Sequence, residues 1–235
     1  MDVSFDFDGR VALVTGVAGS LGSHVAAALQ EAGATVVGVD RQEPDDTHAD
    51  LDLDAIDFYA ADLTDEAAVE ALVASILEAY GRLDVLMNVA GTWKGGDPIE
   101  ETAIEDFQMV FDVNLRTTFL VSKHALPALQ ESEGAIVNVS AKASLSGGTG
   151  DGPYRAAKAG VRLLTETIAE ENTGTVRANA VLPSVIDTPA NREMIPGGDV
   201  EAWVDPADIA LTMLALVSDA TAPTSGAAVP VYGEV

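Results

Sequence analysis

The sequence predicts an α/β fold: a single domain with a doubly wound, seven-stranded parallel sheet and helices on both faces. Apolar segments of strand length alternate with amphipathic segments of helical length along the chain. The strand segments are continuously apolar, which is typical of parallel strands buried on both faces. No linker, repeat or low-complexity segment interrupts the alternation, and 235 residues suit one large α/β domain. We therefore expect residues 1–235 to form one unit.

The strands are expected wherever an apolar run of four to eight residues is followed by turn-forming or polar residues. In chain order these runs are VALVTG at 11–16, TVVGVD at 35–40, IDFYAADL at 56–63, LDVLMNVAG at 83–91, AIVNVS at 135–140, VRANAVLP at 176–183 and AAVPVY at 227–232. The helices are expected where apolar residues recur at helical spacing between them, at 21–32, 65–80, 102–130, 154–172 and 206–218. In such a sheet, ligands bind beyond the carboxyl ends of the strands.

The charge balance excludes several kinds of partner. The chain has 38 acidic and 12 basic residues, a formal net charge of −26, so we expect no nucleic-acid partner. No apolar run approaches the roughly 18 to 20 residues that span a bilayer, so we expect no membrane partner. The first ten residues carry acids where a signal peptide carries basic residues, which predicts a cytoplasmic protein.

The acid excess also predicts the solvent in which the protein works. Only four lysines accompany it, at positions 94, 123, 142 and 158. Molar salt shortens the Debye length to about 3 Å and screens the self-repulsion. We therefore expect a halophilic source, the alternative being an ordinary acidic protein. Cysteine is absent and only three histidines occur, so we expect neither disulfides nor a metal site.

The stretch TGVAGSLGSH, at 15–24, lies between the first expected strand and the first expected helix. Its glycines Gly16, Gly19 and Gly22 allow a tight turn and a close approach of the backbone to a pyrophosphate at the helix start. The spacing is G-x-x-G-x-x-G, and a turn without a ligand is the alternative. Ser20 is compatible with both, because its hydroxyl can cap the helix or donate to a phosphate oxygen.

The second strand ends in Asp40, about twenty residues after the glycine turn. A carboxylate at this place accepts hydrogen bonds from a ribose diol and repels a 2′-phosphate. The adjacent Arg41 could pair with a 2′-phosphate. The sequence therefore favours NAD as the cofactor and makes NADP less likely.

Five further motifs follow in order: NVAG at 88–91, VNL around Asn114, IVNVS ending at Ser140, YRAAK at 154–158 and LPSVIDTP at 182–189. With these motifs the chain resembles the short-chain dehydrogenase/reductase family from about Arg10 to the end. The resemblance implies a one-domain Rossmann fold, strand order 3-2-1-4-5-6-7 and hydride transfer to or from a nicotinamide. It also implies cofactor contacts from Gly16, Gly19, Ser20, Leu21, Gly22, Asp40, Arg41, Asp62, Leu63, Asn88, Ala90, Gly91, Tyr154, Lys158, Pro183, Ser184, Ile186 and Thr188.

Tyr154 and Lys158 are four residues apart and share one face of a helix. An ammonium near a phenol stabilises the phenolate, so we expect Lys158 to lower the pKa of Tyr154 toward the working pH. Tyr154 could then exchange a proton with a small carbonyl or alcohol substrate. The resemblance implies that Lys158 also holds the nicotinamide ribose and that Asn114 supports a proton-relay water.

The serine that the family uses stands thirteen residues before the tyrosine, and this position is Ala141. Ser140 is adjacent, but neighbouring strand residues point to opposite faces. Three possibilities stay open: Ser140 serves through a local irregularity, Ser144 or Ser146 serves from the loop, or no serine is used. We include Ser140 among the expected catalytic residues, with Asn114, Tyr154 and Lys158, because such a hydroxyl stabilises charge on a carbonyl oxygen.

The chain is similar in its loop sequences to one branch of the family, dihydropteridine reductase. The similar segments are GSLGS at 19–23, NVAGTWKGG at 88–96, SAKASLSGGTG at 140–150 and DTPANREMIP at 187–196. Reduction of a quinonoid pterin with NADH needs less carbonyl polarisation, so this activity is an alternative to ordinary carbonyl chemistry. An NAD-binding or redox-sensing protein with little turnover is a second alternative, supported only by Ala141.

A substrate lid is expected at 188–206, after the sixth strand. Thr188 could contact the cofactor carboxamide there, and Met194, Ile195 and Trp203 could close an apolar pocket or only dock the lid to the core. The short lid favours a compact substrate. By resemblance, the 102–130 and 154–172 helices pair between subunits, so we expect a homodimer or homotetramer.

Overall fold

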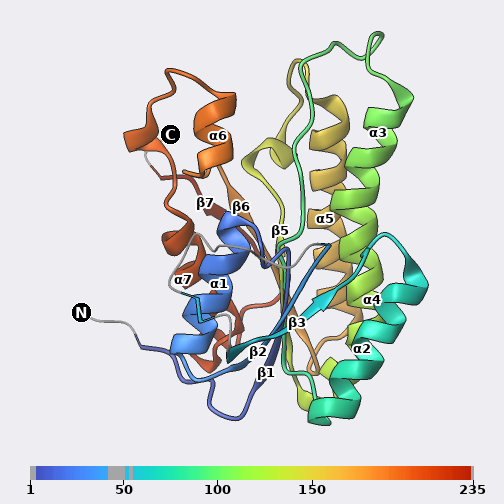
Figure 1. Ribbon diagram of the computed structural model, residues 1–235, viewed down its shortest axis with the longest axis vertical. Helices are drawn as coiled ribbons and strands as arrows, with labels where there is room; N and C mark the ends of the chain where they lie inside the picture. The colour runs from blue at the N-terminus through green and yellow to red at the C-terminus, as the bar shows by residue number, and fades with distance from the viewer. Residues whose placement is uncertain (1–3, 42–50, 53–54, 234–235) are drawn as a thin grey trace.

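The computed structural model describes residues 4–41, 51–52 and 55–233. Strands and helices alternate along these residues (Figure 1). The strands are β1 (Val11–Thr15), β2 (Thr35–Asp40), β3 (Asp57–Ala60), β4 (Val85–Asn88), β5 (Ala135–Val139), β6 (Arg177–Pro183) and β7 (Ala228–Val231). The α-helices are α1 (Ser20–Glu31), α2 (Glu66–Tyr80), α3 (Ile104–Phe111), α4 (Thr117–Ser132), α5 (Gly152–Glu171), α6 (Pro189–Met194) and α7 (Pro206–Val217).

The seven strands form one parallel sheet in the order β3-β2-β1-β4-β5-β6-β7. The order reverses at β1, which pairs with β2 on one side and β4 on the other. This reversal is the place where parallel sheets of this type open a crevice for a ligand. The predicted fold class and strand order are confirmed.

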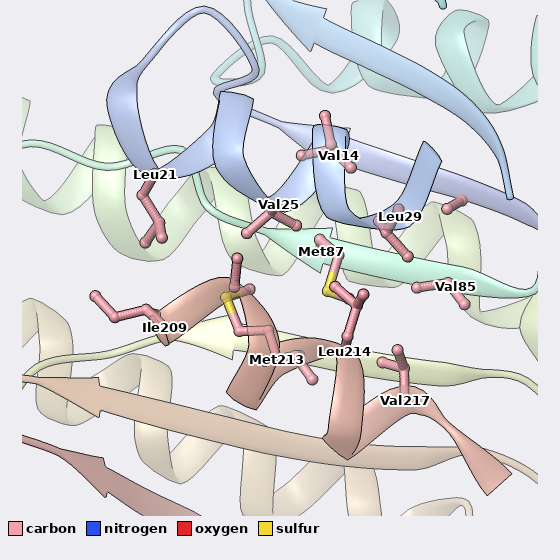
Figure 2. Close-up of a cluster of buried hydrophobic side chains, with 14 of the residues drawn as sticks. Val14, Leu21, Val25, Leu29, Val85, Met87, Ile209, Met213, Leu214 and Val217 are labelled. Atoms are coloured by element: carbon pink, nitrogen blue, oxygen red, sulfur yellow. The ribbon is translucent and has the colours of Figure 1, made fainter. Parts of the chain in front are cut away.

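The two sheet faces are covered by different helices because successive strand residues point to opposite faces. Ala12 and Val14 of β1 belong to one apolar cluster, whereas Val11 and Leu13 belong to the other. The first cluster lies under α1 and α7, where buried side chains of both helices meet Val85 and Met87 of β4 (Figure 2). The second lies under α2, α4 and α5, on the opposite side of the sheet (Figure 1).

Three predicted elements differ clearly from those observed, and the first is the strand expected at 56–63, which is the shorter β3 (Asp57–Ala60). The strand expected at 83–91 ends at Asn88, because the hydroxyl of Thr15 accepts hydrogen bonds from the backbone N–H groups of Val89 and Ala90, at 3.0 Å each. These two groups are thereby withdrawn from the sheet ladder. The helix expected at 102–130 is α3 followed by a π-helical segment, η2 (Asp112–Arg116), and then α4. Asn114 lies within the π-helical segment.

The segment expected as a lid, 188–206, contains α6 and a short 3-10 helix, η4 (Val200–Ala202). Thr188 caps α6, because its side chain accepts a hydrogen bond from the backbone N–H of Asn191. Figure 1 shows α6 beyond the carboxyl ends of the central strands. Among the described residues, no helix is both long and apolar enough to cross a bilayer.

Candidate active site

A cleft of about 1470 Å³ lies at the carboxyl edge of the sheet. Residues that follow each of the strands β1 to β6 line it, together with α5 and the lid. Most of the predicted site residues line this cleft: Gly16, Gly19, Ser20, Leu21, Gly22, Asp40, Arg41, Asp62, Leu63, Ala90, Gly91, Ser140, Tyr154, Lys158, Pro183, Ser184, Ile186 and Thr188. The topology therefore brings together residues that are far apart in the sequence.

The glycine turn is packed so tightly that side chains do not fit. Gly16 has a φ of +71°, and a Cβ there would lie 2.9 Å from the Cα of Ala90. A Cβ on Gly22 would lie only 2.0 Å from the carbonyl oxygen of Gly16. Gly19 occupies the N-cap position of α1, and no side chain caps the helix there. Ser20 is therefore not the helix cap, which was one of the two alternatives for its hydroxyl. The turn presents backbone to the cleft at a helix start, a cradle that fits a pyrophosphate.

Asp40 is held at the rim of this cradle. One carboxylate oxygen accepts from the backbone N–H of Ala18, at 3.2 Å, and the other from that of Arg41, at 2.7 Å. Asp62 lies in the neighbouring wall, where Thr64 donates to it from its hydroxyl and its backbone N–H, which lowers the pKa of the Asp62 carboxyl. The Arg41 guanidinium adds to this lowering. Two carboxylates and one guanidinium therefore share this end of the cleft.

Two predicted site residues, Asn88 and Asn114, lie behind the cleft wall. Asn88 is buried, and its amide donates to Asn138 and Ser122, which ties β4 to β5 and α4. Asn114 is fully buried; its amide donates to the backbone carbonyls of Thr92 and Val110 and accepts from the Thr92 N–H. These side chains therefore lie behind the residues that line the cleft and support its wall, and the cofactor contact expected of Asn88 stays a prediction.

Tyr154 and Lys158 project from α5 into the cleft, as their spacing predicts. Lys158 is only 4% exposed, and its ammonium donates to the backbone carbonyl of Val139 at 2.9 Å. Burial lowers the pKa of Lys158 to about 8. A Cβ on Gly91 would lie 3.1 Å from the Lys158 Nζ and 2.8 Å from the Asn114 Oδ1, so these three residues converge at one point of the wall.

The expected lowering of the Tyr154 pKa is wrong in this structure. The pKa of Tyr154 is raised to about 12: burial is the largest cause, the charge of Asp151 adds to the rise, and the charge of Arg155 opposes it. The Lys158 ammonium lies 5.9 Å from the centroid of the Tyr154 ring and is directed to Val139. Loss of water around the phenol is therefore the dominant effect on its pKa.

The three serines near Ala141 differ in their surroundings. Ser140 lines the cleft, but it is buried and its hydroxyl donates to the backbone carbonyl of Lys158 at 2.8 Å. Ser144 is buried and does not line the cleft. Ser146 is exposed and lines the cleft. Only Ser146 thus presents an exposed hydroxyl to the cleft.

The cleft is also lined by side chains for which the sequence predicted no role. They are Met109, Asp112, Lys142, Asp151, Arg155 and Glu193. Met194 and Ile195 also line the cleft, which is one of the two alternatives for them, and so does Trp93. Trp203 does not; a Cβ on Gly198 would lie 2.5 Å from its ring, so Trp203 docks the lid turn. The sequence contained an indication for one of these residues, because Arg155 directly follows Tyr154 in the motif YRAAK.

Metal chemistry has no visible support in the described part of the chain. No group of three or more His, Asp or Glu side chains there is placed to hold a metal ion. The chemistry that this cleft offers comes from the buried phenol and ammonium and from the glycine cradle.

Comparison with known proteins agrees with this geometry. A family model described as short chain dehydrogenase matches residues 10–197. L-fucose dehydrogenase from Oryctolagus cuniculus is 34% identical over 189 residues, which are 80% of this chain and 66% of that protein. D-threitol dehydrogenase from Mycolicibacterium smegmatis is 33% identical over 253 residues, which cover 99% of this chain and 96% of that protein.

A solved structure extends the likeness to the whole fold. The crystal structure of carveol dehydrogenase from Mycobacterium avium in complex with NAD has a TM-score of 0.87 and 28% sequence identity, covering 98% of each chain. The family model, the long match to a relative and this fold all agree. The chain belongs to the short-chain dehydrogenase family of NAD(P)-dependent oxidoreductases.

Proposed function

We propose that this protein uses NAD to interconvert a compact alcohol and its carbonyl compound, with Tyr154 as the acid and base. The observation that carries this proposal is one continuous cleft, which joins the glycine cradle at Gly16 and Gly22 to the Tyr154–Lys158 face of α5. A dinucleotide on the cradle would extend along the cleft toward Tyr154. A bound nicotinamide supplies the hydride acceptor or donor.

The protein supplies the proton. With its pKa raised to about 12, Tyr154 is protonated near neutral pH and is suited to donate its hydroxyl proton to a carbonyl oxygen in the direction of reduction. In oxidation the phenolate takes the proton from the alcohol. Lys158 lies one turn away and, with Asn114 and Gly91, forms the wall where the resemblance to the family puts the nicotinamide ribose and the relay water.

The role of the missing serine is divided between two residues. Ser140 fixes the backbone of Lys158 through its hydrogen bond to that carbonyl, so we assign it to positioning the ammonium. Ser146 is the exposed hydroxyl that lines the cleft, so we assign it to the substrate oxygen. Ala141 itself offers no hydrogen bond from its side chain.

NAD is favoured over NADP by the charges at the other end of the cleft. Asp40 and Asp62 both line it, and a 2′-phosphate would meet two carboxylates there. Arg41 is the cation of this region, but its charge already lies close enough to Asp62 to lower the pKa of that carboxyl. We therefore expect NADH to bind more tightly than NADPH, and an Asp40→Ala variant to narrow that difference.

The named relatives suggest the kind of substrate. L-fucose and D-threitol, named for two of them, are small molecules rich in hydroxyl groups. The cleft is lined by polar groups, among them Lys142 and Glu193, and by apolar residues of the lid. Such a lining suits a compact polar alcohol. The test is steady-state oxidation at molar KCl with NAD and NADP, over L-fucose, D-threitol, simple diols and simple alcohols. If NADH binds and no alcohol or carbonyl compound turns over, the weakly catalytic NAD-binding alternative is the better description.

Reduction of a quinonoid dihydropterin stays a second candidate. Two observations favour it: Ala141 stands at the serine position, and Trp93, 41% exposed, lines the cleft where an aromatic ring could stack. Quinonoid dihydropterin with NADH belongs in the same assay. Turnover that exceeds that of every carbonyl compound would replace the leading proposal.

We further propose that the protein is a homodimer or homotetramer that works in a salt-rich cytoplasm. Phe107, Phe119 and Leu163, on α3, α4 and α5, are 39%, 48% and 53% exposed. Such apolar side chains on neighbouring helices favour contact with a second copy. Sedimentation at low and at molar KCl tests the oligomeric state.

A further inference from the structure

An ion pair flanks Tyr154 on the wall of the cleft. Asp151 directly precedes α5, Arg155 follows Tyr154, and the Arg155 Nε donates to the Asp151 Oδ1 at 2.5 Å. The two side chains are only 13% and 25% exposed, and both line the cleft. The pair therefore lies in the reaction site, although the function proposed above gives it no part.

Asp151 is bound to Arg155 at the expense of an ordinary helix cap. It occupies the N-cap position of α5, where a carboxylate usually accepts a hydrogen bond from a backbone N–H of the first turn. No such side-chain bond is made here. The carboxylate is directed to the guanidinium instead, which orients Arg155 toward the loop between β5 and α5.

The guanidinium is surrounded by that loop. Its Nη1 lies within hydrogen-bonding distance of three backbone carbonyls, at 3.4 Å from Ala143, 3.2 Å from Ser146 and 3.5 Å from Gly147. A Cβ on Gly148 would lie 2.2 Å from the Arg155 Cζ, so the guanidinium packs directly against the backbone there. The Arg155 side chain thus contacts the backbone along residues 143–148, beside the part of the cleft that contains Tyr154.

Asp151 and the residue before it lie against the loop that contains Trp93. The Gly96 N–H donates to the carbonyl of Gly150 at 2.7 Å. A Cβ on Gly95 would lie 3.2 Å from the Cβ of Asp151. The loop that contains Trp93 and the loop between β5 and α5 therefore meet at the start of α5, next to Tyr154.

We propose that the Asp151–Arg155 pair is a positioning device of the reaction. It fixes the loop 143–148, with the Ser146 hydroxyl, against α5, and it holds Tyr154 between two opposite charges. This inference rests on the proposed function, because it takes Tyr154 as the acid and base. Neither residue of the pair is assigned contact with the reacting atoms.

The charges of the pair act on Tyr154 in opposite directions. Asp151 raises the pKa of Tyr154 and Arg155 lowers it, in addition to the larger effect of burial. Other charged groups line the same cleft from α5, η3 (Lys142–Leu145), the π-helical segment and α6: Lys158, Lys142, Asp112 and Glu193. These groups keep their charges when one member of the pair is neutralised, so the two single variants change the charge next to Tyr154 in opposite directions.

The charge test compares Asp151→Asn with Arg155→Gln. We expect the base-dependent midpoint of the pH profile of kcat/KM for alcohol oxidation to move down in Asp151→Asn and up in Arg155→Gln. Arg162→Gln is the matched control, because Arg162 pairs with Glu166 at the same spacing on α5 and has the same 25% exposure, but does not line the cleft. Shifts of the same sign in the two variants, or a shift in the control, would overturn the proposal.

The geometric test removes no charged group. Gly148→Ala puts a methyl group where the guanidinium lies, whereas Gly147→Ala puts one into open space. Neither glycine has a positive φ, so neither substitution strains the backbone. We expect kcat/KM to fall by about 10²-fold in Gly148→Ala, as for a small misplacement of a reacting group, and to stay near wild type in Gly147→Ala. Equal activities of the two variants would contradict a role for the guanidinium contact.

A readout without substrate separates this inference from the proposed function. Hydrogen exchange of the amides at 144–148 should be faster in Arg155→Gln and Gly148→Ala than in wild type, while NADH affinity and the thermal midpoint of unfolding stay close to wild type. Unchanged exchange refutes the inference even if the enzyme is active. If exchange and NADH affinity behave as expected but Tyr154→Phe keeps its turnover, the role proposed for Tyr154 fails while the pair still holds the loop. If Arg155→Gln does not fold, Gly148→Ala and Asp151→Asn carry the test.

Discussion

Burial is the main cause of the shifted pKa values of both Tyr154 and Lys158. Desolvation penalises the charged form of each group, so it raises the pKa of the phenol to about 12 and lowers that of the ammonium to about 8. At neutral pH such a tyrosine is present as the proton donor that carbonyl reduction needs, whereas the phenolate that alcohol oxidation needs is scarce. The direction of catalysis should therefore depend on pH.

The first residue-scale prediction concerns Tyr154→Phe. The substitution removes only the hydroxyl, so the site keeps its shape while losing its proton donor. We expect turnover of carbonyl compounds to fall by about 10²–10⁴-fold, with NADH affinity nearly unchanged. Steady-state kinetics and fluorescence titration with NADH measure the two quantities. Retained turnover would remove Tyr154 from the role of acid.

The second residue-scale prediction concerns pH. A group whose pKa is raised to about 12 stays protonated through the neutral range, so carbonyl reduction should show no loss from titration of Tyr154 until the pH approaches that value. Alcohol oxidation needs the phenolate, so its rate should rise with pH over the same range. Rate profiles measured in both directions at constant salt test this. An oxidation rate that falls as the pH increases from 7 to 9, in a protein still folded, would speak against it.

At the scale of elements, the ends of the strands arrange the site. Thr15, the last residue of β1, holds the chain after β4 through two hydrogen bonds to its hydroxyl, from Val89 and Ala90. This contact directs residues 89–91 toward Asn114 and Lys158. The π-helical segment between α3 and α4 likewise contains Asn114, whose amide fixes Thr92.

The element-scale prediction is made for Thr15→Val. Valine keeps the shape but cannot accept the two hydrogen bonds, so two N–H groups lose their partner at a buried strand end. We expect the free energy of unfolding to fall by about 1–3 kcal/mol and NADH affinity to weaken. Thr212→Val is the matched control, because Thr212 is a partly exposed residue of α7 whose hydroxyl donates to the carbonyl of Asp208. Denaturant unfolding measured for both variants distinguishes them, and equal stabilities would show that the Thr15 bonds contribute little.

At the scale of the whole molecule, charge is the dominant feature. A formal net charge of −26 repels itself at low ionic strength and repels an anionic cofactor as well. Salt screens both effects, because the Debye length falls from about 10 Å at 0.1 M to about 3 Å at 1 M. Stability and cofactor binding should therefore respond to salt in the same direction.

The whole-molecule prediction follows from this screening. The thermal midpoint of unfolding should rise as KCl increases from low to molar concentration, and NADH affinity should not fall over that range. Calorimetry and fluorescence titration in a KCl series measure the two trends. A steady loss of NADH affinity between low and molar salt would contradict the electrostatic account.

The sequence by itself determined the order of the elements and the chemistry of the cleft. Apolar runs identified all seven strands, and the spacing of Tyr154 and Lys158 put both on one helix face, because strand and helix periodicities are local properties. The glycine turn was also predictable, since the positive φ of Gly16 and the close backbone approaches at Gly16 and Gly22 require glycine.

Only the tertiary structure decided what surrounds each of these groups. The raised pKa of Tyr154, the bond from Ser140 to the Lys158 carbonyl and the burial of Asn88 all depend on segments distant in the sequence. Desolvation and hydrogen-bond partners are set when these segments pack together, so a linear pattern does not contain them. Arg155 is the clearest case: in the sequence it is one letter of YRAAK, and in the fold it holds the loop beside Tyr154.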